Sequence, residues 1–516
     1  MTTMVASDRT GRERGRNAQA PLPRFERGPV LAWSAGFLAV ELAMAARYGL
    51  HRDELYFLAC GRHLAWGYVD QPPFVPLVAR VASALFGASA VSLRVLPALA
   101  GATTVVLAAL IARELGGRRR AQTFAALATA LSPVIIAATH LLSTAGFDIF
   151  FWALLSWLFV RLLRTRDDRL WIAIGAVAGV ALLNKWNVLF LLGAIALGCL
   201  LVPEHRPRLR SPFTLAGGVL ALAIWTPNLV WNAQHDWAAI AMLHSLHAEN
   251  STLGASISFL PLQLLIVGPA LAVFWIAGVR TLRTDRIGRV FAIAFIALLV
   301  AYVLTGAKPY YLAGIYPSLL AAGGVWYERR LAPGPADAAA RGARRTGVVI
   351  VVIALVSLPI SLPVLPERTL PTSSWEGNIN KDLSATIGWP ALVRQVARVA
   401  DSLPPSERAH LVVFTGDYGA AGAIDEYGAR YGLPHAISGH NNYWWWGWGA
   451  ARNGATTITI ELDRSYLSTI FDSITPAGTV ATPHNAWSEE RGAPIFVCRH
   501  QRVSWKTAWP KARHYD

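Results

Sequence analysis

Long apolar blocks constrain the fold of this chain more than any other feature of its sequence. The 516 residues are 54% hydrophobic and only 15% charged, which is little charge for a water-soluble protein. The apolar residues gather in blocks of roughly 17–25 residues, the length that crosses a bilayer as a helix. We therefore expect a polytopic α-helical membrane protein with about 11 transmembrane helices, at residues 29–48, 92–112, 122–139, 147–163, 169–184, 187–202, 213–231, 256–279, 290–306, 310–326 and 347–365.

Positive charge follows these blocks in a way that predicts the topology. The net charge is +16, and arginine clusters fall in short loops between apolar blocks. Such clusters mark the cytoplasmic side of a membrane, which removes nucleic acid as the expected partner. With the basic tail 1–28 in the cytoplasm, the first loop, residues 49–91, lies outside. We expect a multi-pass protein of the cell (cytoplasmic or inner) membrane, with its transmembrane domain at 29–365.

The chain changes character after the last apolar block. Polar residues, Gly and Pro become frequent, and residues 410–415, 456–462 and 494–497 resemble strands, while 421–431 resembles a short helix. These patterns predict an extracytoplasmic α/β domain over residues 366–516, large enough to have its own core.

The first loop carries charge where an apolar helix leaves the membrane. Arg52, Asp53, Glu54, Arg62 and Asp70 all lie in it. Charge at a membrane boundary is costly unless it faces water, a partner or a substrate. Because Asp53 and Glu54 are adjacent, they would point about 100° apart on a helix; one is expected to act and the other to orient or cap.

Three further charges are predicted at the same outer face. Lys185 and Lys308 end the fifth and ninth blocks, and Asp148 begins the fourth. Each has a simpler explanation, since lysines snorkel to headgroups and aspartate caps helices. Two lysines at the same depth, beside the acidic first loop, nevertheless favour a shared anionic ligand such as a lipid phosphate. Carboxylates can act as general bases and cations can stabilise a phosphate leaving group.

An aromatic segment near the C-terminus allows two interpretations. His440, Asn441, Asn442 and Trp445 lie in a stretch rich in tryptophan. Aromatic rings beside Asn and His are typical of a surface that contacts a sugar or acceptor, and equally of a loop at the membrane interface.

Several of these motifs, taken in order, resemble the bacterial family-39 glycosyltransferases, relatives of protein O-mannosyltransferases and of aminoarabinose transferases. The resemblance implies the GT-C fold, a polyprenyl-phosphate-linked sugar donor, an extracytoplasmic active site and inversion at the anomeric carbon. It implies that Asp53 is the catalytic base and that Asp148 is a second acidic position. Relatives often have His or Lys where this chain has Gln71. The motifs are Asp53-Glu54-Leu55-Tyr56, Gly67 to Pro73, Phe147-Asp148, the Lys185 turn, Lys308-Pro309-Tyr310-Tyr311 and Tyr316-Pro317.

These observations predict a glycosyltransferase that moves a sugar from a polyprenyl phosphate to an acceptor hydroxyl on a glycan, lipid or protein. Asp53, Glu54 and Asp148 are the expected catalytic residues. The residues expected to bind the lipid phosphate or sugar are Arg52, Arg62, Asp70, Lys185, Lys308, Tyr310 and Tyr311. No cofactor is certain, although some relatives bind a divalent metal. The alternative is a polytopic transporter or flippase, which would place ionisable residues near the bilayer midplane.

Overall fold

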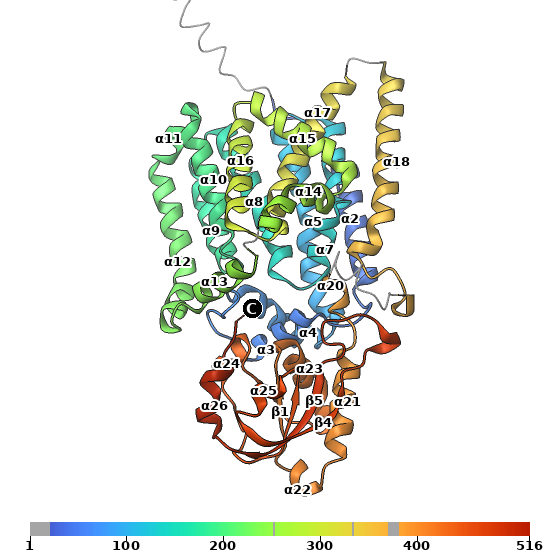
Figure 1. The fold of residues 1–516 in the computed structure, drawn as a ribbon. Coiled ribbons are helices and arrows are strands. Elements are labelled where there is room, and N and C mark those ends of the chain that lie inside the picture. Colours follow the sequence, from blue (N-terminus) through green and yellow to red (C-terminus); the bar gives the residue numbers. More distant parts are fainter. Residues whose placement is uncertain (1–20, 251–252, 333–334, 370–380, 516) are drawn as a thin grey trace, which may run out of the picture.

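A computed structural model of the chain describes residues 21–250, 253–332, 335–369 and 381–515. Most of the predicted tail 1–28 lies outside these residues. Figure 1 shows a bundle of helices above a smaller region that contains a sheet. The bundle helices are α2 (Arg27–Met44), α5 (Ala90–Glu114), α6 (Arg119–Ala130), α7 (Pro133–His140), α8 (Thr144–Thr165), α9 (Leu170–Leu182), α10 (Val188–Leu201), α11 (Arg206–Leu209), α12 (Pro212–Gln234), α13 (Ala238–Asn250), α14 (Leu253–Val267), α15 (Pro269–Thr284), α16 (Gly288–Thr305), α17 (Tyr316–Leu331) and α18 (Ala336–Ser361).

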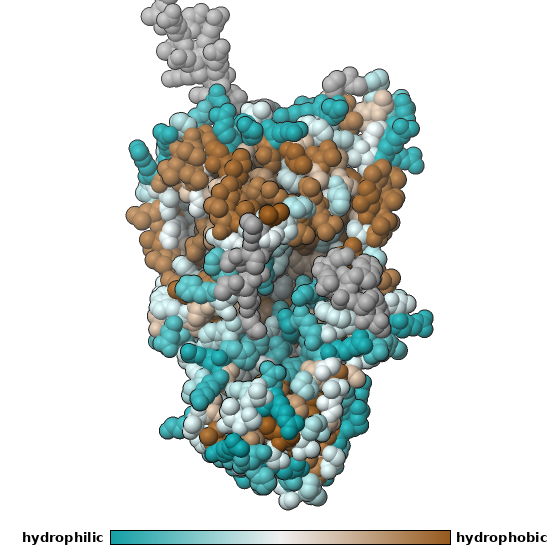
Figure 2. Space-filling model, viewed as in Figure 1, coloured by the Kyte–Doolittle hydropathy of each residue, from teal (hydrophilic) through white to brown (hydrophobic). Residues whose placement is uncertain are grey.

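The predicted polytopic helical fold is confirmed. Fewer helices than the predicted number of about 11 are long and apolar enough by themselves to cross a membrane. Within the described residues, five helices qualify singly: α5, α8, α12, α16 and α18. Three bent pairs raise the number to as many as eight, including α14 and α15, which meet at a 107° bend. Each of the eleven predicted segments coincides with a helix or with such a pair. A broad apolar band crosses the face of the bundle seen in Figure 2, as expected of a surface that faces lipid.

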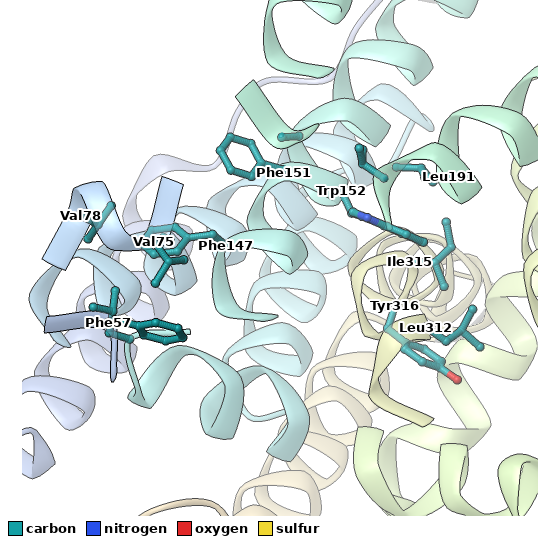
Figure 3. Packing of buried hydrophobic residues seen from close by; sticks show 14 of the residues in the cluster. Phe57, Val75, Val78, Phe147, Phe151, Trp152, Leu191, Leu312, Ile315 and Tyr316 are labelled. Carbon is teal, nitrogen blue, oxygen red and sulfur yellow. The ribbon is translucent and has the colours of Figure 1, made fainter. Parts of the chain in front are cut away.

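The first loop folds into two helices that lie between the bundle and the sheet. These are α3 (Arg52–Arg62) and α4 (Phe74–Phe86). The Phe74 ring lies 5.1 Å from the Phe147 ring of α8, and Figure 3 shows Phe57 and Val75 beside Phe147. Burial of these side chains fixes the charged start of α3 against the end of the bundle.

The C-terminal region, residues 381–515, contains a five-stranded mixed sheet in the order β2-β1-β3-β5-β4. Strand β1 pairs in parallel with β2 and β3, whereas β5 pairs antiparallel with β3 and β4. The predicted strands at β1, β3 and β5 are confirmed. The other two were not predicted, because β2 has only three residues and β4 contains Pro476 and Gly478. The elements are α21 (Trp389–Asp401), β1 (Val412–Thr415), α23 (Tyr418–Tyr427), β2 (Ala436–Ser438), α24 (Asn441–Trp446), β3 (Thr457–Ile460), β4 (Phe471–Thr479), β5 (Pro494–Gln501) and α26 (Trp505–Ala512).

Two glycines allow the close contacts that bring these parts together. A Cβ atom on Gly422 of α23 would lie 3.0 Å from the Leu55 side chain of α3. A Cβ atom on Gly314 would lie 2.6 Å from the Trp152 ring of α8, and Gly314 belongs to the short 3₁₀ helix η2 (Pro309–Ile315). The absent side chains let the C-terminal region contact the first loop and let η2 contact α8.

Candidate active site

The charged run at the start of α3 is a helix cap. The backbone N–H of Asp53 donates to His51 Nδ1 at 3.0 Å, and the N–H of His51 donates to Glu54 Oε2 at 2.8 Å. This reciprocal arrangement is a capping box, which satisfies N–H groups that a helix start leaves unpaired. The cap directs Asp53 and Glu54 into different environments.

Asp53 faces the C-terminal region and keeps partial access to solvent. Its side chain is 35% exposed, and the Tyr418 hydroxyl donates to Asp53 Oδ1 at 2.8 Å. Burial by itself would raise the pKa of this carboxyl, but the nearby His51 and Arg52 and the bond from Tyr418 hold the pKa below its ordinary value. Asp53 is therefore a carboxylate at neutral pH and can accept a proton.

Glu54 has a different role from the catalytic one that the sequence suggested. Its side chain is fully buried, and Arg94 of α5 donates to both of its oxygens, at 3.0 and 2.8 Å. The N–H groups of His51 and Leu142 donate to the same carboxylate. With four donors around it, Glu54 has no access to a substrate, and we assign it to fixing α3 on the bundle.

The two predicted lysines line one cavity of about 430 Å³, here named the lysine cavity. Among the described residues, neither Lys185 nor Lys308 forms a salt bridge within the 4.0 Å limit of an ion pair. The Lys185 ammonium lies 4.1 Å from the Tyr311 ring centre and 5.2 Å from that of Tyr310. Two half-buried cations that form no direct ion pair are suited to an anionic group. The cavity is lined by residues 68–72, 185–187, 189, 190, 228, 232, 239, 242, 243, 247, 302, 305–308 and 311.

Asp148 lies behind this cavity, one turn into α8. Ser143 caps the helix instead, since it accepts from the N–H of Gly146. The buried Asp148 carboxylate accepts from Asn187 Nδ2 at 2.8 Å, and the Tyr302 hydroxyl donates to Asn187 Oδ1 at 2.5 Å. Asp148 also interacts electrostatically with Lys185. It thus orients groups of the cavity wall without lining the wall itself.

Asp70 is the acidic residue that lines the lysine cavity. The Tyr56 hydroxyl donates to Asp70 Oδ1 at 2.9 Å. Asp70 keeps an exposed surface, while desolvation by the surrounding protein raises the pKa of its carboxyl to about 6. Asp53 and Asp70 therefore differ in pKa within one network, an arrangement typical of sites with acid–base chemistry.

Other predicted binding residues connect the first loop to the C-terminal region. Arg62 pairs with Glu426, and Arg52 donates to Glu489 at 2.8 Å. Arg52 also lines a second cavity, of about 450 Å³, beside the sheet. Neither arginine lines the lysine cavity, so the prediction that both contact the phosphate is not supported by their positions.

The aromatic segment contacts the first loop from the other side. The N–H of Val69 donates to Asn442 Oδ1 at 2.7 Å, directly before Asp70. Trp445 donates to the Tyr515 hydroxyl at 3.0 Å. His440 accepts from the N–H of Tyr418, and Asn441 begins α24 at φ 46°. The segment therefore supports Asp53 and Asp70 indirectly, and its contact with a sugar or acceptor stays a prediction.

Sequence reasoning missed several residues because their chemistry depends on distant partners. Arg94 is a lone charge at the start of an apolar block, and that anomaly was its only signal. Tyr418 lies 365 residues from Asp53, and nothing local marks it. Within the described residues, no group of three His, Cys, Asp or Glu side chains is arranged to hold a metal ion.

Comparison with known proteins finds a family and a curated relative that each match part of the chain. The family of dolichyl-phosphate-mannose-protein mannosyltransferases matches residues 70–231. Lipid A galacturonosyltransferase RgtD of Rhizobium johnstonii is 29% identical over 231 residues, which are 43% of this chain and 48% of that protein. The chain thus matches about half the length of this curated relative.

Solved structures show the fold. ArnT from Cupriavidus metallidurans bound to undecaprenyl phosphate superposes with a TM-score of 0.62 at 17% identity, covering 92% of this chain and 98% of ArnT. The apo state of the same protein gives a TM-score of 0.58, also at 17% identity, covering 91% of this chain and 97% of that one. The chain therefore shares the fold of ArnT, and its residues 70–231 are similar to the mannosyltransferase family.

Proposed function

We propose that the chain transfers a sugar from a polyprenyl-phosphate donor to an acceptor hydroxyl, with inversion at the anomeric carbon. The observation that carries this proposal is the lysine cavity, in which Lys185, Lys308 and Asp70 line a mainly apolar pocket. A lipid phosphate has the matching composition, with one anionic group on a long apolar chain. The ArnT structure with undecaprenyl phosphate supports the same class of donor.

The donor would bind with its phosphate between Lys185 and Lys308. The adjoining cavity wall is apolar and includes Leu189, Phe190 and Leu243, which can contact the polyprenyl chain. This arrangement leaves the sugar on the side of the cavity that Asp70 lines.

The transfer would use two carboxylates: Asp70 lines the cavity, and Asp53 lies outside its lining but interacts electrostatically with Lys308. As the acceptor oxygen attacks the anomeric carbon, Asp53 takes its proton and the new glycosidic bond forms. The bond between the anomeric carbon and the phosphate oxygen breaks, and the phosphate keeps the electron pair. Lys185 and Lys308 stabilise the departing phosphate, and the negative charge of Asp70 stabilises the positive charge that develops on the sugar.

The orientation and partners belong to the same proposal. The tail 1–28 and the arginine clusters lie on the cytoplasmic side, whereas the first loop and residues 366–516 lie outside. The acceptor is a glycan, lipid or protein at that outer face. The transporter alternative is disfavoured because Lys185 and Lys308 line one cavity together with residues 68–72 of the first loop, whereas a transporter would place ionisable residues near the bilayer midplane.

Cells provide the test. Lipid-linked sugars are measured by mass spectrometry in a deletion strain that lacks the protein. The same measurement is made in that strain after it receives the wild-type protein, Asp53→Asn or Asp472→Asn. The control Asp472 is an exposed carboxylate on β4, paired with Arg502. We expect one polyprenyl-phosphate sugar to accumulate without the protein and with Asp53→Asn, but not with Asp472→Asn. Normal levels with Asp53→Asn would exclude Asp53 as the base, and no accumulation in the deletion strain would refute the proposed donor class.

A further inference from the structure

Gln71 differs from every other amide side chain in the wall of the lysine cavity. It is 5% exposed, and within the described residues neither its Oε1 nor its Nε2 atom has a hydrogen-bond partner. A buried amide without partners costs free energy, because it has given up its bonds to water. Such a group needs an explanation, and one explanation is a ligand that supplies the missing partners.

The other amides of the wall are all satisfied inside the protein. Asn187 bonds to Asp148 and Tyr302. Asn228 donates to the Trp66 carbonyl at 2.8 Å and accepts from Trp186 at 2.9 Å. Asn232 donates to the Asn228 carbonyl and accepts from the N–H of Ala239. The protein can therefore satisfy amides in this wall, and Gln71 is the exception.

The turn that carries Gln71 is held in place, so poor local order does not explain the missing partners. The N–H of Tyr68 donates to the Gln71 carbonyl at 2.9 Å. Two prolines follow directly, and they restrict the backbone at 72 and 73. The side chain is thus positioned in the cavity wall before any ligand arrives, next to Asp70.

The chemistry of the unpaired atoms distinguishes between two parts of the donor. An amide offers one acceptor and two donors, and both ends of Gln71 are unpaired. A phosphate oxyanion accepts hydrogen bonds but donates none, so it would leave Oε1 unpaired. A hydroxyl can donate to Oε1 and accept from Nε2. Lys185 and Lys308 already supply the charge that the phosphate requires.

We propose that Gln71 binds a hydroxyl group of the donor sugar and selects donors that carry it. This inference rests on the proposed function, because the donor cavity must hold a polyprenyl-phosphate sugar. It specifies the substrate further: the sugar has a free hydroxyl that reaches the wall beside Asp70. A donor without that hydroxyl would leave the amide buried and unpaired, which is how polar sites reject analogues.

The test compares two lipids and two variants of the full-length protein in detergent. The lipids are undecaprenyl phosphate and the polyprenyl-phosphate sugar that accumulates in cells lacking the protein. We expect Gln71→Met to weaken binding of the lipid-linked sugar by roughly 10- to 100-fold, the effect of about two hydrogen bonds. Binding of undecaprenyl phosphate should stay within about 2-fold of wild type, since no bond to phosphate is lost. Lys308→Met should weaken the binding of both lipids.

Thermal unfolding separates this role from a structural one. Met has nearly the volume of Gln and no polar end, so Gln71→Met should melt at the wild-type temperature or higher. A clear loss of stability would assign Gln71 to packing and overturn the proposal. The proposal would also be overturned if Gln71→Met weakened the binding of both lipids equally, or if it left the binding of both unchanged. Unchanged binding of both lipids by Lys308→Met would refute the proposed donor site itself.

Discussion

The assignment of Glu54 to structure rather than catalysis makes a quantitative prediction. Glu54 is fully buried and accepts four hydrogen bonds, two of them from a buried Arg94. Glu54→Gln keeps the shape but removes the charge and places an NH₂ group against surrounding donors. Breaking a buried ion pair by changing one partner costs about 3–5 kcal/mol. We expect a large fall in the apparent melting temperature of the purified protein.

A double-mutant cycle tests the cause of that fall. Glu54→Gln leaves the Arg94 charge unpaired, and Arg94→Met leaves the Glu54 charge unpaired. The double variant removes both charges, so it should be more stable than either single variant. Asp53→Asn, at a partly exposed carboxylate, should lose activity and keep its melting temperature. A Glu54→Gln protein with wild-type stability and no transfer activity would refute the structural assignment.

Three further predictions concern the proposed site. Lys185→Met and Lys308→Met should each weaken binding of undecaprenyl phosphate by roughly 10-fold or more, because each removes a charged partner of the phosphate. Salt screens this attraction, so the difference between the wild type and each variant should be larger at low salt than at high salt. Equal affinity of the wild type and the variants at both salt concentrations would contradict this prediction. The Asp70 carboxyl, with its pKa near 6, is ionised above about that pH and neutral below it, so kcat/KM should fall as pH drops below about 6, and Asp70→Asn should be slow but lack this limb. Tyr418→Phe should lower kcat roughly 10-fold with an unchanged donor KM, since the Asp53 carboxylate loses one hydrogen bond; combined with Asp53→Asn it should cost nothing more, and an additive loss would separate the two residues.

The sequence by itself determined the membrane bundle and the place to look for chemistry. Block length predicts transmembrane helices because a helix must span the bilayer core with its backbone bonds satisfied. Charge in the first loop marked Asp53 and Asp70, and the paired occurrence of Lys185 and Lys308 indicated an anion site. These are local properties of short segments, and the structure brings the two lysines into one cavity.

Only the tertiary structure decided which of these charges is free to act. Arg94 neutralises Glu54 across 40 residues, and Glu426 pairs with Arg62 across 364. Whether a buried polar group is satisfied depends on what the fold places within about 3 Å of it, and sequence spacing does not contain that information. For the same reason Gln71 gave no signal of its own in the sequence, where it was only a departure from relatives. In the structure it is a buried amide without a partner.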